Sequence, residues 1–155
     1  MRAACLALLV ISAVACGGVG PSDVNAFDEA AFAAARARWQ SAGVTNYTVE
    51  SRNSCFCPPH LNFWTRLTVR GDSIVSAEPV DPLPSNMPSH TIGWRTVPQL
   101  FDAIESAASD GDTTRKVSVS YDPVLGFPRD VSIECGPNIA DCDRGHFLRS
   151  LTRIP

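Results

Sequence analysis

The chain has 155 residues, of which 45% are hydrophobic and 19% are charged, and its formal net charge is −3 at pH 7. This length is enough for one domain with an ordinary hydrophobic core. Because surfaces that bind nucleic acid are basic, the mildly acidic balance argues against a nucleic-acid partner.

Residues 1–15 are typical of a secretory signal segment. Arg2 is followed by an apolar run over residues 3–14, which is shorter than the ~20 residues of a membrane-spanning helix. The small residues before Cys16 resemble the lipobox of bacterial lipoproteins, with Ala13 where leucine is commoner. The resemblance implies cleavage before Cys16 and diacylation of that cysteine. We therefore expect an exported protein, lipid-anchored in the cell membrane or outer membrane, whose domain faces the periplasm or the exterior. A plainly cleaved signal segment and an uncleaved anchor stay open.

The rest of the chain divides into a flexible tether over residues 16–24 and a single domain over residues 25–155. The domain opens with a predicted helix, "NAFDEAAFAAARARWQSAG", which Asn25 can cap and Gly43 can end. Its large apolar side chains fall near one face, which is typical of a helix that packs on a core.

Alternating apolar and polar residues predict strands on both sides of a cysteine-containing loop. Tyr47 and Val49 alternate in the first strand, and Leu67 and Val69 alternate in the second. The letters "RGDS" provide a turn into a third strand, so that the second and third strands form a hairpin.

The second half begins with the clearest predicted helix, "TVPQLFDAIESAASDGD", in which Thr96 and Gln99 form a capping-box pattern. After it, Val117, Val119 and Tyr121 alternate with polar residues, and "DPVLGFP" forms a turn. The segments "VSIEC" and "HFLRSLTRI" are the remaining predicted strands.

This order of elements predicts an α+β fold. Strands that are joined by short turns are antiparallel neighbours, so we expect an antiparallel sheet of four to six strands. Two helices on one face of that sheet would bury both apolar stripes. The order of helix, strands, helix, strands also suggests an α-β-β-β repeated layout.

Apart from Cys5 in the signal segment and the expected lipidation site Cys16, the chain has four cysteines: Cys55, Cys57, Cys135 and Cys142. An even number in an exported chain favours disulfides, and spacing alone leaves three pairings open. In an extended strand the Cα atoms of Cys55 and Cys57 would lie ~6.6 Å apart, at the upper limit for a disulfide. A local bond between them therefore requires a turn, which the following "PP" makes plausible.

A metal site is the alternative interpretation of the same loops. His60 follows one cysteine pair in "CFCPPH", and His146 follows the other in "CDRGH". Zinc prefers four nitrogen or sulfur ligands in a tetrahedron, but this cysteine–histidine spacing is not a standard zinc motif. We therefore expect neither a metal nor another cofactor.

No catalytic residue is predicted, because the motifs of nucleophilic hydrolases, zinc proteases, phosphate loops and dinucleotide-binding proteins are missing from the sequence. The simplest interpretation of "YDPVLGFP" is a tight strand connection. The alternative is that Tyr121 and Phe127 form an exposed aromatic recognition patch.

Several pieces in this order resemble an exported bacterial family, the domain of unknown function DUF6174: "NYTVES", "CFC", "LTVRGDSIV", "TVPQLFDAI" and "YDPVLGFPRDVSIE". The resemblance covers roughly residues 35–153. Because the family's CxC generally occurs without a second pair, the resemblance implies a local Cys55–Cys57 bond, which leaves Cys135 with Cys142. The family has no established activity, so the resemblance implies a fold and a location, not a function.

The first functional hypothesis is therefore a non-catalytic, lipid-tethered binding or structural module of the cell envelope, with an envelope protein as its unidentified partner. The second is a metal-binding protein or enzyme, which would bring Cys55, Cys57, His60, Cys135 and His146 into one pocket. The third is an inhibitor of a secreted enzyme, by analogy with small α+β inhibitors.

Overall fold

The computed structural model describes residues 27–84, 87, 91–111, 115–136, 139 and 142–155. The predicted signal segment, the lipidation site Cys16 and the tether lie outside the described residues. Within the described part of the chain, neither helix combines the length and the apolar character that crossing a membrane requires.

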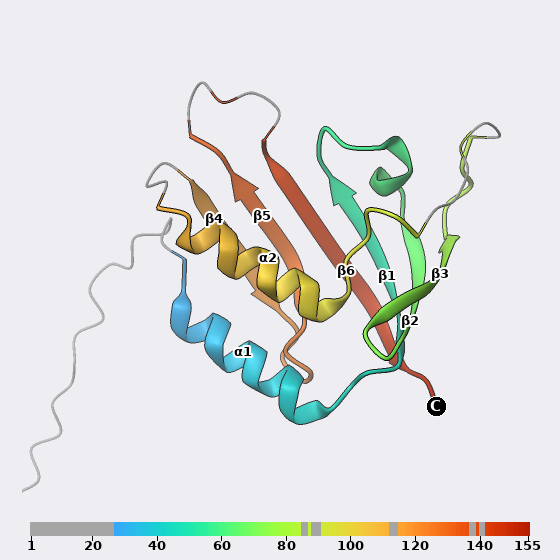
Figure 1. The fold of residues 1–155 in the computed structure, drawn as a ribbon, viewed down its shortest axis with the longest axis horizontal. Helices are drawn as coiled ribbons and strands as arrows, with labels where there is room; N and C mark the ends of the chain where they lie inside the picture. Colours follow the sequence, from blue (N-terminus) through green and yellow to red (C-terminus); the bar gives the residue numbers. More distant parts are fainter. Residues whose placement is uncertain (1–26, 85–86, 88–90, 112–114, 137–138, 140–141) are drawn as a thin grey trace, which may run out of the picture.

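Six strands form one antiparallel sheet, and two helices lie on it (Figure 1). The helices and the short 3-10 turn are α1 (Glu29–Ala42), α2 (Val97–Ser109) and η1 (Pro59–Asn62). The strands are β1 (Tyr47–Ser54), β2 (Thr65–Arg70), β3 (Ser73–Pro79), β4 (Lys116–Tyr121), β5 (Pro128–Glu134) and β6 (Arg144–Arg153). They are ordered β3-β2-β1-β6-β5-β4 across the sheet. This arrangement confirms the predicted α+β class and the antiparallel sheet.

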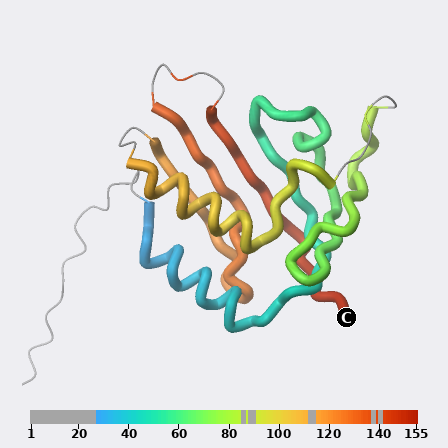
Figure 2. Tube along the Cα trace, viewed as in Figure 1, coloured from blue at the N-terminus to red at the C-terminus, as the bar shows by residue number. Residues whose placement is uncertain are grey.

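Both helices lie on the same side of the sheet, and Figure 2 shows the chain that leads into α2 on that side as well. The core between the two layers follows the predicted alternation of the strands. Tyr47, Val49, Leu67 and Val69 are each at most 1% exposed, because every second side chain of a strand points to the same face. The intervening side chains of β1 and β2 therefore point away from the helices.

The first helix begins later than predicted. Asp28, not Asn25, is the residue at the N-cap, and its Oδ1 accepts a hydrogen bond from the backbone N–H of Ala31 at 2.8 Å. Gly43 ends the helix in the left-handed conformation, with φ of 59°, as expected of a C-terminal glycine.

The second helix begins where the sequence predicts. The backbone N–H of Gln99 donates to the Thr96 hydroxyl, and the Gln99 side chain accepts from the Thr96 backbone, so the capping box is complete. The next backbone N–H, that of Val97, donates to the Tyr47 hydroxyl at 2.9 Å. This buried hydrogen bond joins the start of α2 to the central strand β1.

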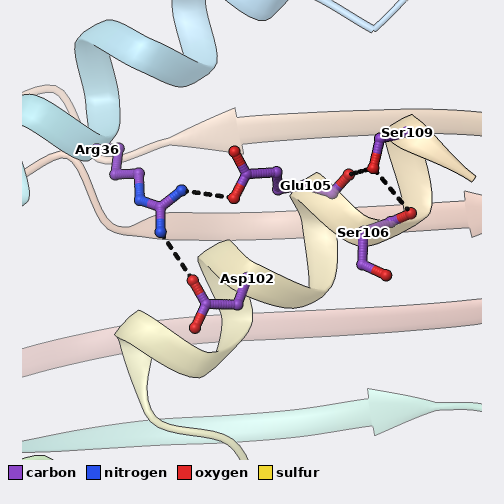
Figure 3. A network of polar contacts seen from close by, with 5 residues as sticks. All are labelled: Arg36, Asp102, Glu105, Ser106 and Ser109. Carbon is purple, nitrogen blue, oxygen red and sulfur yellow. Dashed lines mark hydrogen bonds and ion pairs between the residues drawn. The ribbon is translucent and has the colours of Figure 1, made fainter.

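A polar clamp holds the two helices together (Figure 3). The guanidinium of Arg36 on α1 lies 2.8 Å from a carboxylate oxygen of Asp102 and 2.8 Å from one of Glu105, both on α2. The rings of Phe32 on α1 and Phe101 on α2 also pack edge to face, with centroids 5.8 Å apart. The helices therefore dock on each other as well as on the sheet.

Candidate functional site

The face of the sheet opposite the helices carries a cluster of arginine and aromatic side chains. We call it the arginine face and define it as Arg52, Trp64, Arg66, Phe147 and Arg149, gathered around Glu50. Strand register brings these residues together, because Glu50 of β1 lies opposite Arg66 on β2 and Arg149 on β6. Cross-strand neighbours of this kind have side chains close enough to interact.

Glu50 is the charged centre of this face. It is only 8% exposed. One carboxylate oxygen lies 2.9 Å from Nη2 of Arg66, and the other lies 2.9 Å from Nε of Arg149. The hydrogen bond from Arg66 has the larger effect on the pKa of Glu50, and that from Arg149 follows. Both lower the pKa, because each favours the charged form of the carboxyl group. Both arginines are thereby held in place on the sheet.

Stacked cations and rings extend the cluster across the strands. The guanidinium carbon of Arg149 lies 3.9 Å from the ring centroid of Trp64. That of Arg52 lies 5.2 Å from Trp64 and 5.0 Å from Phe147. Cation–π contacts at these distances are attractive, so they order side chains that would otherwise be mobile in water.

Two local disulfides lie at one end of this sheet. Cys55 is bonded to Cys57 just after β1, with Cα atoms 5.2 Å apart. Cys135 is bonded to Cys142 between β5 and β6, with Cα atoms 6.1 Å apart. Because Ser54 pairs with Gly145, the two bonded loops leave the sheet from neighbouring strands.

The Cys55–Cys57 loop presents an aromatic side chain to solvent. Phe56, the single residue between the bonded cysteines, is 85% exposed. It lines a hollow of about 570 Å³ together with Phe147 of the arginine face, and Glu134, Asp143 and Arg144 lie on the same hollow. We call this the Phe56 hollow.

The two histidines of the alternative metal interpretation lie in different environments. His60 is in η1, where its Nε2 lies 3.3 Å from the carbonyl oxygen of Ile92 and its ring packs near Trp94. His146 is buried on the helix-covered face of β6, where its Nδ1 lies 2.9 Å from Oδ1 of Asn53. The two histidines are therefore not neighbours in a common ligand set.

The cysteines do not complete such a set either. His146 and Cys135 line one cavity, but the residues that line it do not include Cys55, Cys57 or His60. Cys135, Cys142 and Asp143 have potential ligand atoms within 4.8 Å of one another. In this structure the two sulfurs are bonded to each other, so they are not the thiolates that zinc requires.

Tyr121 and Phe127, the alternative recognition patch, do not form an exposed aromatic surface. Phe127 is 5% exposed and belongs to the core. The ring of Tyr121 stacks on Phe101 with centroids 6.4 Å apart, and burial raises the pKa of its hydroxyl to about 12. Phe56, which was not among the residues predicted for a recognition patch, is instead solvent-exposed. The signal was present in "CFC", because a three-residue disulfide loop gives its middle side chain little room to turn inward.

Comparison with models of protein families shows that residues 31–153 match DUF6174, described as a family of unknown function. No curated protein and no solved structure matches the chain. The match covers most of the chain and includes both disulfide loops and the arginine face.

Proposed function

The chain belongs to the DUF6174 family, and from that premise we propose that it is a non-catalytic binding module of the bacterial cell envelope that docks a protein partner through Phe56 and the arginine face. The partner fits this surface if it offers an apolar pocket for Phe56 and carboxylates for the arginines. A lipid anchor at Cys16 would hold the module at the membrane.

The exposure of Phe56 is the observation that carries this proposal. Aromatic and arginine side chains dominate the binding energy of many protein interfaces, chiefly where a side chain fills a pocket on the partner. The Cys55–Cys57 bond restrains the backbone that carries the 85% exposed Phe56, so binding orders less of this loop.

The charges of the arginine face support the choice of partner. Three arginines surround one carboxylate, Glu50, which leaves an excess of positive charge on the cluster. Complementary charge speeds association and selects among partners. Acidic groups on the partner would therefore match the arginine face.

Site-specific crosslinking tests the proposal in intact cells. A photoreactive phenylalanine analogue is placed at position 56 of the full chain and, as a control, at position 124, where Val124 is also exposed at 78%. We expect one prominent protein adduct from position 56 that is not formed from position 124.

The captured protein is then purified and its affinity for the domain is measured. Phe56→Ala should weaken binding at least tenfold, which corresponds to about 1.4 kcal/mol, whereas Val124→Ala should bind like the wild type. Equal adducts from both positions, or unchanged affinity of the Phe56→Ala variant, would refute the role of Phe56. If the captured protein is a secreted enzyme that loses activity on binding, the module is an inhibitor.

Lipid anchoring at Cys16 is the second part of the proposal. It is supported by the apolar segment and the small residues that precede Cys16. Cells that express the full chain should incorporate a palmitate analogue into it, and Cys16→Ser should abolish the label. Equal labelling of the wild type and the variant would contradict the anchor.

A further inference from the structure

A second concave site lies on the other side of the sheet, between α2 and the start of β6. It is a cavity of about 260 Å³ that we call the arginine pocket and define by Arg95, Arg115, Arg144 and His146. Small residues of α2, such as Ala103, form its apolar wall. The four defining residues come from the loop before α2, the chain just before β4, and β6.

Positive charge is in excess in this pocket. Three arginines are among its described lining residues, and none of the described lining residues is acidic. Asp110 forms an ion pair with Nη1 of Arg115, which neutralises one of the three. The neighbouring carboxylate of Asp143 accepts a hydrogen bond from the backbone N–H of Cys135 at 2.9 Å.

Arg115 also has unused hydrogen-bonding capacity. Its Nε is buried and has no hydrogen-bond partner among the described residues. A buried donor without a partner is unfavourable, so such groups usually have a protein group, a ligand or a water molecule as a partner.

His146 shows that the arginines converge. Burial, and after it the charges of Arg95 and Arg144, together lower the pKa of His146 to about 4. The imidazole is therefore neutral at pH 7, and two guanidinium groups lie close enough to act on it. An anion among these guanidinium groups would relieve their mutual repulsion.

From this geometry, we propose that the arginine pocket binds a phosphate group, either as inorganic phosphate or as the phosphate of a small monoester. Guanidinium forks match the oxygens of phosphate and bind it in bidentate fashion. Pockets for drug-sized ligands usually measure about 300 to 1,000 Å³, so a cavity of about 260 Å³ suits a smaller anion.

This site is separate from the proposed docking surface, although Arg144 lines both the arginine pocket and the Phe56 hollow. Arg95 lines the arginine pocket but not the Phe56 hollow, so Arg95→Ala is the better test variant. Arg129→Ala, which removes an exposed arginine of β5, is the matched control. Failure of phosphate binding would leave the crosslinking test at Phe56 unaffected.

The measurement is a titration of the oxidised protein with inorganic phosphate at pH 7, with ionic strength held constant by sodium chloride. Calorimetry reports the affinity, and the imidazole proton signals of His146 in NMR report the location. We expect one site per chain, a shift of the His146 signals, at least tenfold weaker binding by Arg95→Ala and unchanged binding by Arg129→Ala.

Further arms of the titration distinguish the sources of the phosphate. Glycerol 3-phosphate that binds more tightly than inorganic phosphate would identify a monoester as the ligand, and the reverse order would identify the free ion. The thermal midpoint of each variant without phosphate shows that it is folded, and Arg95→Gln replaces Arg95→Ala if the latter is not. The proposal is overturned if the His146 signals do not move at millimolar phosphate, or if the Arg95 variant binds as tightly as the wild type.

Discussion

Glu50 is the residue on which the order of the arginine face depends. Removing its carboxylate leaves Arg66 and Arg149 without their shared partner, although both arginines are about half exposed and can be solvated. We therefore expect Glu50→Gln to lower the free energy of unfolding at pH 7 by only about 1 to 2 kcal/mol, as measured by urea denaturation.

The same residue predicts a dependence of stability on pH. The pKa of Glu50 in the folded state lies below its ordinary value of 4.5, so the folded state favours the charged carboxylate. Its contribution is complete above pH 4.5 and is lost as pH falls through the lowered folded-state pKa. The difference in stability between wild type and Glu50→Gln should therefore shrink in acid. A constant difference from pH 7 downwards would contradict this assignment, and Glu134→Gln is the control.

Individual residues also show where prediction from sequence reaches its limit. Asn25 and Asp28 are both good capping residues, and the pattern could not show that the helix starts after the second. Exposure of Phe127 was the alternative prediction, because this residue lies in a turn rich in glycine and proline. It is buried because that turn packs against α1, which is a contact between distant segments.

The β4–β5 turn packs closely against α1. The carboxylate of Asp122 accepts hydrogen bonds from the backbone N–H groups of Val124 and Leu125, which closes the turn. Gly126 then has φ of +82°, and a Cβ at this position would lie 2.3 Å from the carbonyl oxygen of Ala35 on α1. Only glycine allows the helix and the turn to approach this closely.

We therefore expect Gly126→Ala to be strongly destabilising. Gly111→Ala is a matched control, because Gly111 also has positive φ, of +78°, and a Cβ there would meet nothing within 4 Å. Backbone strain alone should lower the free energy of unfolding of Gly111→Ala by about 1 kcal/mol. The additional clash should bring Gly126→Ala to about 3 kcal/mol in urea denaturation. Equal effects of the two substitutions would show that α1 does not need the close contact.

The clamp at Arg36 should contribute less than this packing. Asp102 and Glu105 are 65% and 58% exposed in their side chains, so water and salt weaken their attraction to Arg36. We expect Arg36→Ala to lower the free energy of unfolding by about 0.5 to 1 kcal/mol at low salt and by less at high salt. Arg38→Ala, at an exposed position of the same helix, should change it little. An effect of Arg36→Ala that salt does not alter would assign the role to packing on Phe32 instead.

At the scale of the molecule, local patterns predicted the elements but not their neighbours across the sheet. Hairpins join β2 to β3 and β4 to β5, and short turns make such pairs predictable. The central pairing of β1 with β6 joins the two ends of the domain, and no short turn in the sequence indicates it. This pairing also creates the candidate site, because it brings Arg149 and Phe147 to Glu50 and Arg52.

The repeated α-β-β-β layout stays a prediction about the order of elements along the chain. A rotation that carried β1–β3 onto β4–β6 would keep their order across the sheet but reverse every strand direction. Such a rotation turns the sheet over, so it would place the two helices on opposite faces. Figure 1 shows them on the same face, so the two halves are not related by a single rotation.

The placement of the disulfides predicts how the whole molecule responds to reduction. Each bond closes a short loop, with sequence separations of 2 and 7, at one end of the sheet, and neither ties the first half of the chain to the second. Loop-closure entropy for such short loops gives about 1.5 kcal/mol for Cys55–Cys57 and about 2.5 kcal/mol for Cys135–Cys142. A domain of this size is usually stable by about 5 to 15 kcal/mol.

We therefore expect the exported protein to contain no reactive thiol at these four cysteines and, after reduction, to remain folded with a free energy of unfolding lower by about 4 kcal/mol or less. Thiol counting in denaturant checks the first part, and urea denaturation followed by circular dichroism, with and without dithiothreitol, checks the second. The variant with all four cysteines replaced by serine should match the reduced protein.

Four reactive thiols before reduction would refute the paired state, whereas complete unfolding on reduction would indicate bonds that join the two halves. Retention of the fold together with loss of partner binding would instead place the role of the Cys55–Cys57 bond at Phe56, because the core of sheet and helices does not depend on it.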